Sequence, residues 1–232
     1  MSKKRITAVI LAAGCGSRMG SDITKQRMTV FGKTLLYRSV AAFERSSLVD
    51  DIVVVCRADE ENFALSQTKD LKKVRAIIHG GNTRAESAAI AARFIEDDSG
   101  IIMIHDAARC LVLPEDISKV ATSALKTGAA TAAYPVTDTV KLLGKSGNIT
   151  STTDRSRLLI AQTPQAFDLS LYKRAIDICP SDVNVTDDNM LIERMGIEVT
   201  PVMTSKYNIK ITTPEDIAYA EFVIGRNTDK YE

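Results

Sequence analysis

The sequence predicts an α/β protein with a mostly parallel central sheet and helices on both faces. Short β-branched runs alternate with helical patterns along most of the 232 residues, which is typical of βαβ units. The 45% hydrophobic content is enough for a substantial core, and the 25% charged content is ordinary for a soluble protein. We therefore expect one domain over residues 1–232, with an insertion at about 136–160.

The expected elements follow in chain order. Apolar runs predict strands at 6–11, 52–56, 74–78, 101–104 and 131–136. Helical patterns lie between them at 34–45, 83–95 and 115–126. Beyond the insertion we expect helices at 168–178 and 186–194, strands at 197–203 and 208–211, and a last helix at 214–223. Thr83 with Glu86 has the spacing of a capping box, Pro214 suits a first helical position, and the polar tail at 227–232 is expected to fray.

The alternation breaks between about 136 and 160. Two strand-like runs, VTDTVKLL and NITSTTDRSRLL, flank a glycine-rich turn at 144–148, and this pattern predicts a β-hairpin. A long hairpin is not stable alone in water, so we expect this arm to pack on another subunit. A mobile loop is the alternative reading.

The first strand runs into a loop of small residues from Ala12 to Gly16, with Arg18 and Lys25 shortly beyond. Glycines at the carboxyl edge of a parallel sheet let backbone N–H groups approach an anion closely. Two positive charges beside such a loop favour a polyphosphate that reacts. A glycine turn without a ligand is the alternative. Met19 occupies the third glycine position of the dinucleotide fingerprint, which argues against a dehydrogenase.

A second glycine motif, Gly32-Lys33-Thr34, has the residues that end a P-loop. That motif requires a glycine five residues earlier, where this chain has Arg27, and the segment does not directly follow a strand. We therefore expect no P-loop here.

Five further residues suit the chemistry of phosphates. Asp106 follows an apolar strand, where one carboxylate with substrate phosphates can hold Mg²⁺, although it could equally cap a turn. Arg109 could reach an anion or lie exposed on the surface. Gly81 and Ser87 flank a capped helix start, where N–H donors attract anions, with plain capping as the alternative. Lys210 lies in an apolar segment, where a lysine is costly unless paired.

Composition excludes several classes of protein. The net charge of +1 argues against nucleic-acid binding through a basic face. No segment resembles a signal peptide or a membrane span, so we expect a cytoplasmic protein. The four cysteines are dispersed, which suggests reduced thiols, and two histidines are too few for a structural zinc site.

The motifs LAAGCGSRMG, Lys25-Gln26, GGNTRAES, HDAAR, TDTVK, TDRSRL, QTPQAF, TDDNML and NIKITTPED occur in this order between about Ile6 and Phe222. As an ordered set they resemble the 2-C-methyl-D-erythritol 4-phosphate cytidylyltransferase family. The resemblance implies a Rossmann-like fold, a β-arm exchanged across a homodimer, and Mg²⁺-dependent transfer of CMP from CTP to a sugar-alcohol phosphate.

The resemblance also implies roles for individual residues. The cations on the triphosphate and the transition state match Arg18 and Lys25. The cradle of the cytidine and the phosphates matches Ala12, Ala13, Gly14, Gly16, Gly81 and Ser87, and the metal ligand matches Asp106. The surroundings of the methylerythritol phosphate match Arg109, Thr139, Arg155 and Lys210. With Arg18 and Lys25, the residues Arg155 and Lys210 are the expected catalytic residues. Thr139 and Arg155 lie on the arm and are expected to enter the active site of the neighbouring subunit.

The chain departs from the family pattern at three positions. Cys110 replaces a proline that relatives usually carry after HDAAR, and this is expected to loosen the loop. Tyr207 stands in a stretch where some relatives have an acidic residue, so a second protein ligand for Mg²⁺ is not expected. Cys15 is read as a packing residue.

Two alternative functions stay open at this point. Ribitol-5-phosphate cytidylyltransferases share the fold and the nucleotide donor, but they tend to have LAGG and HDSVRP where this chain has LAAG and HDAAR. A non-catalytic nucleotide-binding module is the other alternative. Retention of Arg18, Lys25, Asp106 and Lys210 together argues against it.

Overall fold

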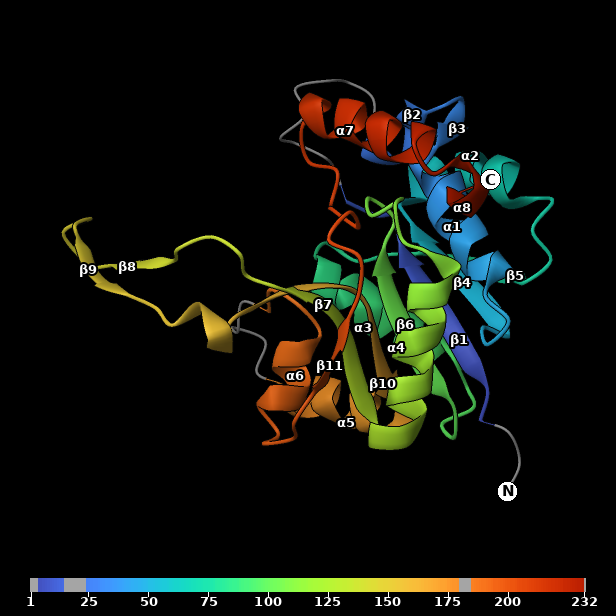
Figure 1. The fold of residues 1–232 in the computed structure, drawn as a ribbon. Coiled ribbons are helices and arrows are strands. Elements are labelled where there is room, and N and C mark those ends of the chain that lie inside the picture. The colour runs from blue at the N-terminus through green and yellow to red at the C-terminus, as the bar shows by residue number, and fades with distance from the viewer. Residues whose placement is uncertain (1–3, 15–23, 180–184, 232) are drawn as a thin grey trace.

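A seven-stranded sheet forms the centre of the computed structural model, which describes residues 4–14, 24–179 and 185–231 (Figure 1). In spatial order the strands are β11 (Thr200–Met203), β7 (Ala129–Pro135), β10 (Leu159–Asp168), β6 (Ile101–Asp106), β1 (Ile6–Leu11), β4 (Asp51–Cys56) and β5 (Val74–His79). β10 runs antiparallel to β6 and β7, and the other pairs are parallel. The predicted α/β class with a mostly parallel sheet is confirmed.

Helices cover both faces of this sheet, as predicted. One face packs against α1 (Leu35–Arg45), α2 (Glu61–Thr68) and α4 (Pro114–Thr127). The other face packs against α3 (Arg84–Phe94), α5 (Leu169–Ile178) and α6 (Asn189–Glu193). Side chains alternate between the faces along a strand, so Ala8 and Ile10 join the first core while Val9 joins the second. Burial on both faces explains why every residue of β1 except Thr7 is apolar.

Four details of the predicted elements are wrong. Residues 208–211 are not a strand, although the N–H of Ile211 still donates to the Ala108 carbonyl at 2.8 Å. The helix expected at 186–194 is confined to α6, and α2 was not predicted. The sheet strand β10 was missed because its residues Gln162, Thr163 and Gln165 are polar, yet their exposed fractions are only 1%, 4% and 1%.

The carboxyl-terminal segment folds back instead of fraying. α7 (Pro214–Gly225) and α8 (Thr228–Tyr231) share an apolar cluster with Val30 and Leu111. Tyr231 is buried there, and its hydroxyl donates to the Leu111 carbonyl at 3.2 Å. The polar composition of this tail predicted fraying, but the buried aromatic ring of Tyr231 holds it against the body.

Gly32 belongs to a β-turn, so the expectation of no P-loop is confirmed. The turn joins β2 (Thr29–Val30) and β3 (Lys33–Thr34), and Phe31 and Gly32 have φ of 46° and 68°. Positive φ at both central positions is typical of a tight two-residue hairpin. Thr34 then caps α1, because its Oγ1 accepts from the N–H of Tyr37 at 3.1 Å.

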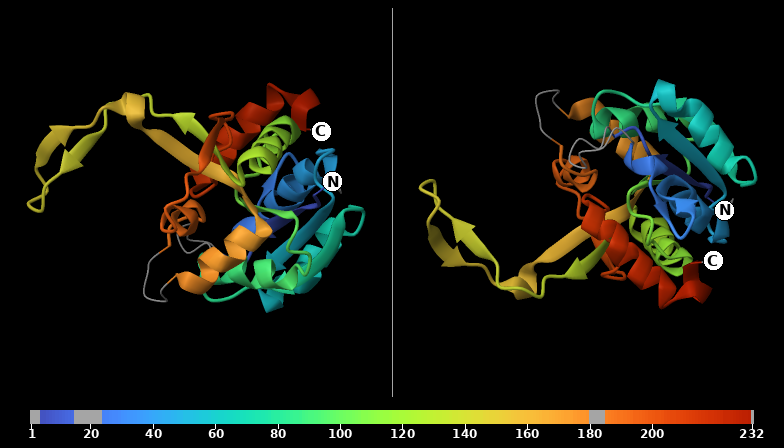
Figure 2. Two further views of the ribbon diagram at one scale, coloured as in Figure 1. Left: turned by 90° about the horizontal axis from the view of Figure 1, so that it is seen from below. Right: turned by 90° about the horizontal axis from the view of Figure 1, so that it is seen from above.

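The insertion forms the predicted hairpin and projects from the body as an arm in every view (Figures 1 and 2). Its strands are β8 (Lys141–Leu143) and β9 (Ile149–Thr152), followed by the short η4 helix (Arg155–Arg157). Leu142, Leu143 and Ile149 on this arm are 54%, 66% and 64% exposed. Among the described residues, no helix is long and apolar enough to cross a membrane.

Candidate active site

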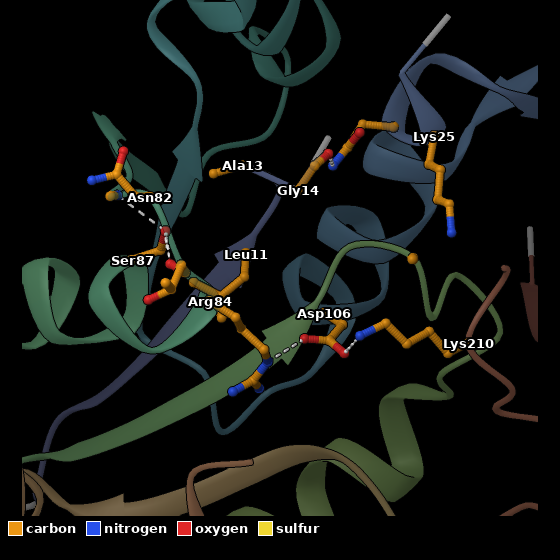
Figure 3. Close-up of a pocket in the computed structure, with 13 residues that line it drawn as sticks. Leu11, Ala13, Gly14, Lys25, Asn82, Arg84, Ser87, Asp106 and Lys210 are labelled. Carbon is orange, nitrogen blue, oxygen red and sulfur yellow. Dashed lines mark hydrogen bonds and ion pairs between the residues drawn. The ribbon is translucent and has the colours of Figure 1, made fainter. Parts of the chain in front are cut away.

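A cavity of about 290 Å³ opens where β1 and β6 end (Figure 3). It is lined by elements that are distant in sequence: the loop after β1, the η2 turn (Lys25–Arg27), the start of α3, the end of β6, and the segment before α7. The carboxyl ends of parallel strands and helix N-termini are the parts of an α/β fold that bind ligands. The predicted residues that line it are Ala13, Gly14, Lys25, Gly81, Ser87, Asp106 and Lys210.

Other predicted residues do not line this cavity. Ala12 is buried beside it, and its N–H donates to the Val55 carbonyl at 2.7 Å. Arg109 donates to the Asn208 carbonyl at 2.9 Å, and its buried Nε has no hydrogen-bond partner among the described residues. Gly16 and Arg18 lie outside the described residues, as does Cys15.

The two predicted residues on the arm also lie away from the cavity of their own chain. Thr139 and Arg155 are exposed, and neither belongs to the cavity lining. The Arg155 guanidinium donates to the Thr137 carbonyl at 2.6 Å, which fixes it within the arm. One chain therefore does not bring its arm residues to its own pocket.

Gly80 allows the loop after β1 and the start of α3 to pack closely together. A Cβ atom at this position would lie 2.6 Å from the Ser87 Oγ and 2.8 Å from the Ala13 Cβ, so another residue would push the two walls apart. Ser87 then closes the turn, because its Oγ accepts from the Gly81 N–H at 3.1 Å and donates to the Thr83 carbonyl at 2.9 Å.

The capping box predicted at the start of α3 forms in part. The N–H of Glu86 donates to the Thr83 Oγ1 at 3.0 Å, as expected. The Glu86 carboxylate accepts from the N–H of Asn82 at 2.8 Å instead of closing on Thr83. The N–H groups of Gly81 and Asn82, at the helix start where donors were expected to attract an anion, therefore already have partners.

Asp106 lies between two cations at the end of β6 (Figure 3). Its Oδ1 accepts from the Arg84 Nε at 2.9 Å and its Oδ2 from the Lys210 Nζ at 2.7 Å. Burial alone would raise the pKa of Asp106, but the charges of Arg84 and Lys210 outweigh it and hold that pKa well below its usual range. Asp106 is therefore an ionised carboxylate in the pocket wall.

The prediction that Lys210 is paired is correct, since its partner is Asp106. The expected reason, burial within an apolar strand, is wrong. The segment is not a strand, and the Lys210 side chain is 41% exposed. Lys25 is the more deeply buried lysine, at 8% exposed, and its Nζ lies 3.4 Å from the Thr212 carbonyl. Arg84 and its second partner, Asp188, were not predicted as site residues.

The neighbouring His105 is poorly suited to act as a general base. It is fully buried, and burial lowers its pKa to about 3, so the imidazole is neutral. Its ring nitrogens lie 3.0 Å from the Thr163 Oγ1 and 3.2 Å from the Arg109 carbonyl, and its ring packs on Phe43. Cys110 is buried too, and burial raises the pKa of its thiol to about 12.

The residues present fit one kind of metal site. No group of three or more His, Cys, Asp or Glu side chains that could hold a metal occurs within the described residues. Mg²⁺ is often held by one or two carboxylates together with substrate phosphates, and Asp106 can supply one carboxylate. Both Asp106 oxygens already accept from a cation, so a metal on Asp106 would compete with Arg84 and Lys210 for this carboxylate.

The fold and the pocket define an α/β enzyme suited to phosphate-bearing substrates. A match to the family described as "IspD: 2-C-methyl-D-erythritol 4-phosphate cytidylyltransferase" spans residues 6–226. The chain belongs to this family of cytidylyltransferases, which are nucleotidyltransferases.

Curated relatives with that name cover almost the whole chain. The protein of Pelotomaculum thermopropionicum is 40% identical over 224 residues, which is 95% of this chain and 94% of the relative. The protein of Geobacter metallireducens is 40% identical over 226 residues, which is 94% of this chain and 97% of the relative.

Solved structures of proteins with this activity are similar to the chain over nearly its whole length. The 4-diphosphocytidyl-2C-methyl-D-erythritol synthase of Anaerococcus prevotii superposes with a TM-score of 0.86 at 29% identity, covering 96% of this chain and 99% of that one. The 2-C-methyl-D-erythritol 4-phosphate cytidylyltransferase of Francisella tularensis gives 0.80 at 31% identity, covering 94% and 99%.

Proposed function

We propose that this chain transfers CMP from CTP to 2-C-methyl-D-erythritol 4-phosphate, giving 4-diphosphocytidyl-2-C-methyl-D-erythritol and pyrophosphate. This reaction belongs to isoprenoid biosynthesis by the non-mevalonate pathway. The observation that carries the proposal is the line of alternating charges, Arg84, Asp106 and Lys210, in a pocket beside the glycine loop of a family member. We treat residues 1–232 as one nucleotidyltransferase domain with the arm inserted.

The reaction needs no general base. A phosphate oxygen of the acceptor forms a bond to the α-phosphorus of CTP, and the bond from that phosphorus to the pyrophosphate oxygen breaks. The acceptor is largely a dianion at neutral pH, since the second pKa of a phosphate monoester is about 6. The neutral, buried His105 is consistent with this chemistry.

The difficulty of the reaction lies in bringing two anions together. Fixed positive charges that face the developing charge on phosphorus stabilise the transition state, because they need no reorganisation. In this proposal Lys25 contacts the triphosphate and Lys210 contacts the acceptor phosphate. Arg18 joins Lys25 on the triphosphate, and Arg109 supports the acceptor side.

A divalent cation completes the site in this proposal. Asp106 would hold Mg²⁺ together with oxygens of the triphosphate, and the ion would neutralise phosphate charge and polarise the reacting phosphorus. Ala12, Ala13, Gly14, Gly16, Gly81 and Ser87 would surround the cytidine and the phosphates.

The arm completes the acceptor site of a second copy. Leu142, Leu143 and Ile149 are exposed apolar side chains on a two-stranded hairpin, which supports a homodimer held through the arm. In such a dimer Thr139 and Arg155 would enter the partner's pocket and bind the methylerythritol phosphate. We place the protein in the cytoplasm, where CTP is made. The described cysteines Cys56, Cys110 and Cys179 are free thiols, as a reducing compartment requires.

Pyrophosphate release tests the proposal. The purified protein is given each of the four ribonucleoside triphosphates with methylerythritol phosphate or ribitol 5-phosphate, with and without Mg²⁺. We expect release only with CTP, methylerythritol phosphate and Mg²⁺ together. Preference for ribitol 5-phosphate would move the chain to the other cytidylyltransferase class, and binding of CTP without release would mark a non-catalytic module.

A further inference from the structure

The line of charges in the pocket continues into the protein interior. Arg84 donates from Nε to Asp106 and from Nη1 to the Asp188 Oδ2 at 2.7 Å. The Tyr172 hydroxyl donates to the other oxygen of Asp188 at 2.6 Å. The side chains of Asp106 and Arg84 are 10% and 25% exposed, whereas that of Asp188 is 0% exposed.

The carboxylate of Asp188 is held by rigid parts of the fold. Its backbone N–H donates to the Gln165 Oε1 at 2.9 Å, and Gln165 lies on the central strand β10. Tyr172, on α5, is fully buried with its ring stacked on Phe167 at 5.3 Å. Burial and the charge of Asp188 raise the pKa of Tyr172 well above its usual value, so this hydroxyl keeps its proton.

The two carboxylates that share Arg84 differ in access. Asp106 lines the cavity, and a metal–triphosphate complex can reach it. Asp188 does not belong to that lining and is closed off from solvent. Removing the partner of a partly buried guanidinium is costly. If Asp106 were the sole carboxylate on Arg84, a cation that weakened this pair would leave Arg84 without a charged partner.

Resting on the function proposed above, we propose that Asp188 is a positioning residue for catalysis. It anchors Arg84 in the pocket wall, so that Asp106 is free to exchange this cation for a metal–triphosphate complex. Tyr172 and Gln165 keep the anchor in place. Asp188 touches no substrate in this scheme, and its effect reaches the reaction through Arg84 and Asp106.

The variant Asp188→Asn tests this role, because the amide keeps the shape and removes the charge. Asp106 would then be the single charged partner of Arg84 and would be held more tightly. We expect the affinity for CTP with Mg²⁺, measured by titration calorimetry, to fall by about 10- to 100-fold, the usual effect of losing an outer partner of a metal ligand. CTP binding without Mg²⁺ should change much less. The Mg²⁺ concentration for half-maximal pyrophosphate release should rise in parallel.

A matched control is available one residue away. Asp187 accepts from the Gln165 Nε2 at 2.9 Å and from the Met190 N–H at 3.2 Å, so it braces the same loop from the other side. Asp187→Asn should lower the melting temperature without the Mg²⁺-dependent loss. Tyr172→Phe removes one hydrogen bond to Asp188 but leaves its charge in place, so it should weaken Mg²⁺-dependent binding less than Asp188→Asn does.

Normal Mg²⁺-dependent CTP binding by folded Asp188→Asn overturns the proposal, as does an equal loss in Asp187→Asn. If Asp188→Asn does not fold, Arg84→Gln carries the test, because it removes the guanidinium that would otherwise hold Asp106. Arg84→Gln should then keep its Mg²⁺-dependent CTP binding, and a Mg²⁺-dependent loss of about 10-fold or more in that variant overturns the proposal. Wild-type protein that releases no pyrophosphate from CTP would count against the proposed function, and that outcome is separate from any difference between variants.

Discussion

At the scale of single residues, the pocket holds its two lysines in different ways. Lys210 is partly exposed and pairs with Asp106, so its charge is already balanced in the wall. Lys25 is 8% exposed, its Nζ lies 3.4 Å from the Thr212 carbonyl, and its charge helps to lower the pKa of Asp216. Burying an ammonium is costly, and an anionic ligand in the cavity would offset that cost further. We therefore expect Lys25 to contact the triphosphate.

Lys25→Ala should lower kcat by at least about 10², the scale for loss of one preorganised donor to a developing charge. Pyrophosphate release at saturating CTP and methylerythritol phosphate measures it. Lys33→Ala is the matched control, because this lysine lies on the β2–β3 hairpin, outside the cavity lining. Turnover close to the wild-type rate in Lys25→Ala would exclude this role.

Some of these residues could be predicted from the chain and others could not. Asp106, Gly81 and Ser87 follow strands or open a capped helix, so local pattern alone places them at the sheet edge. Arg84 and Asp188 are joined across 104 positions in sequence, and a carboxylate within TDDNML shows no local sign of burial. Contacts of that kind depend on how β10, α5 and α6 pack, which no local pattern specifies.

At the scale of elements, helix ends were more predictable than strands with polar side chains. Pro214 and Asp216 signal the start of α7, and α7 begins at Pro214. There the Asp216 Oδ2 accepts from the N–H of Thr212 at 2.6 Å, from its Oγ1 at 2.9 Å and from the N–H of Thr213 at 2.9 Å. β10 was not predicted, because strands were sought as runs of apolar residues and this strand contains Gln162 and Gln165. Both glutamines are buried and form hydrogen bonds to neighbouring loops.

Asp216→Ala should reduce the free energy of unfolding at neutral pH by about 1 kcal/mol, the typical value of a helix cap. Burial raises the pKa of Asp216, but hydrogen bonds from Thr212 and Thr213 outweigh it and hold this pKa below the ordinary value of 3.8. A carboxylate with a depressed pKa stabilises the fold above its unfolded pKa and loses that effect as pH falls through the folded pKa.

The difference between wild type and Asp216→Ala should therefore be constant near neutrality and shrink below about pH 4. Urea unfolding followed by circular dichroism at several pH values measures it. Glu221→Ala, at an exposed position on the same helix, is the control and should match wild type throughout. A difference that stays constant into acid would show that the Asp216 charge does not stabilise α7.

At the scale of the whole molecule, the arm separates two groups of residues that the proposed reaction needs together. The body holds Lys25, Asp106 and Lys210 in one pocket, while Arg155 lies on the arm and is bonded to Thr137 within it. Figures 1 and 2 show the arm extending away from that body. A second copy related by two-fold symmetry can supply what each chain lacks, because both copies exchange the same element.

Mixed dimers can decide whether Arg155 acts on the partner's site. Alone, Arg155→Ala should raise the KM for methylerythritol phosphate and leave the KM for CTP unchanged. The mixing experiment is therefore run with methylerythritol phosphate far below the KM of Arg155→Ala, where both parent dimers are nearly inactive.

When Arg155→Ala and Lys25→Ala chains are co-expressed with different tags, random pairing makes half of the dimers hybrids. In each hybrid one site has native Lys25 from one chain and native Arg155 from the other, so activity should recover to about a quarter of the wild-type level. If Arg155 served its own chain, neither hybrid site would be complete and mixing would restore nothing. Arg157→Ala, which changes the same charge on the same η4 turn, should leave both KM values unchanged.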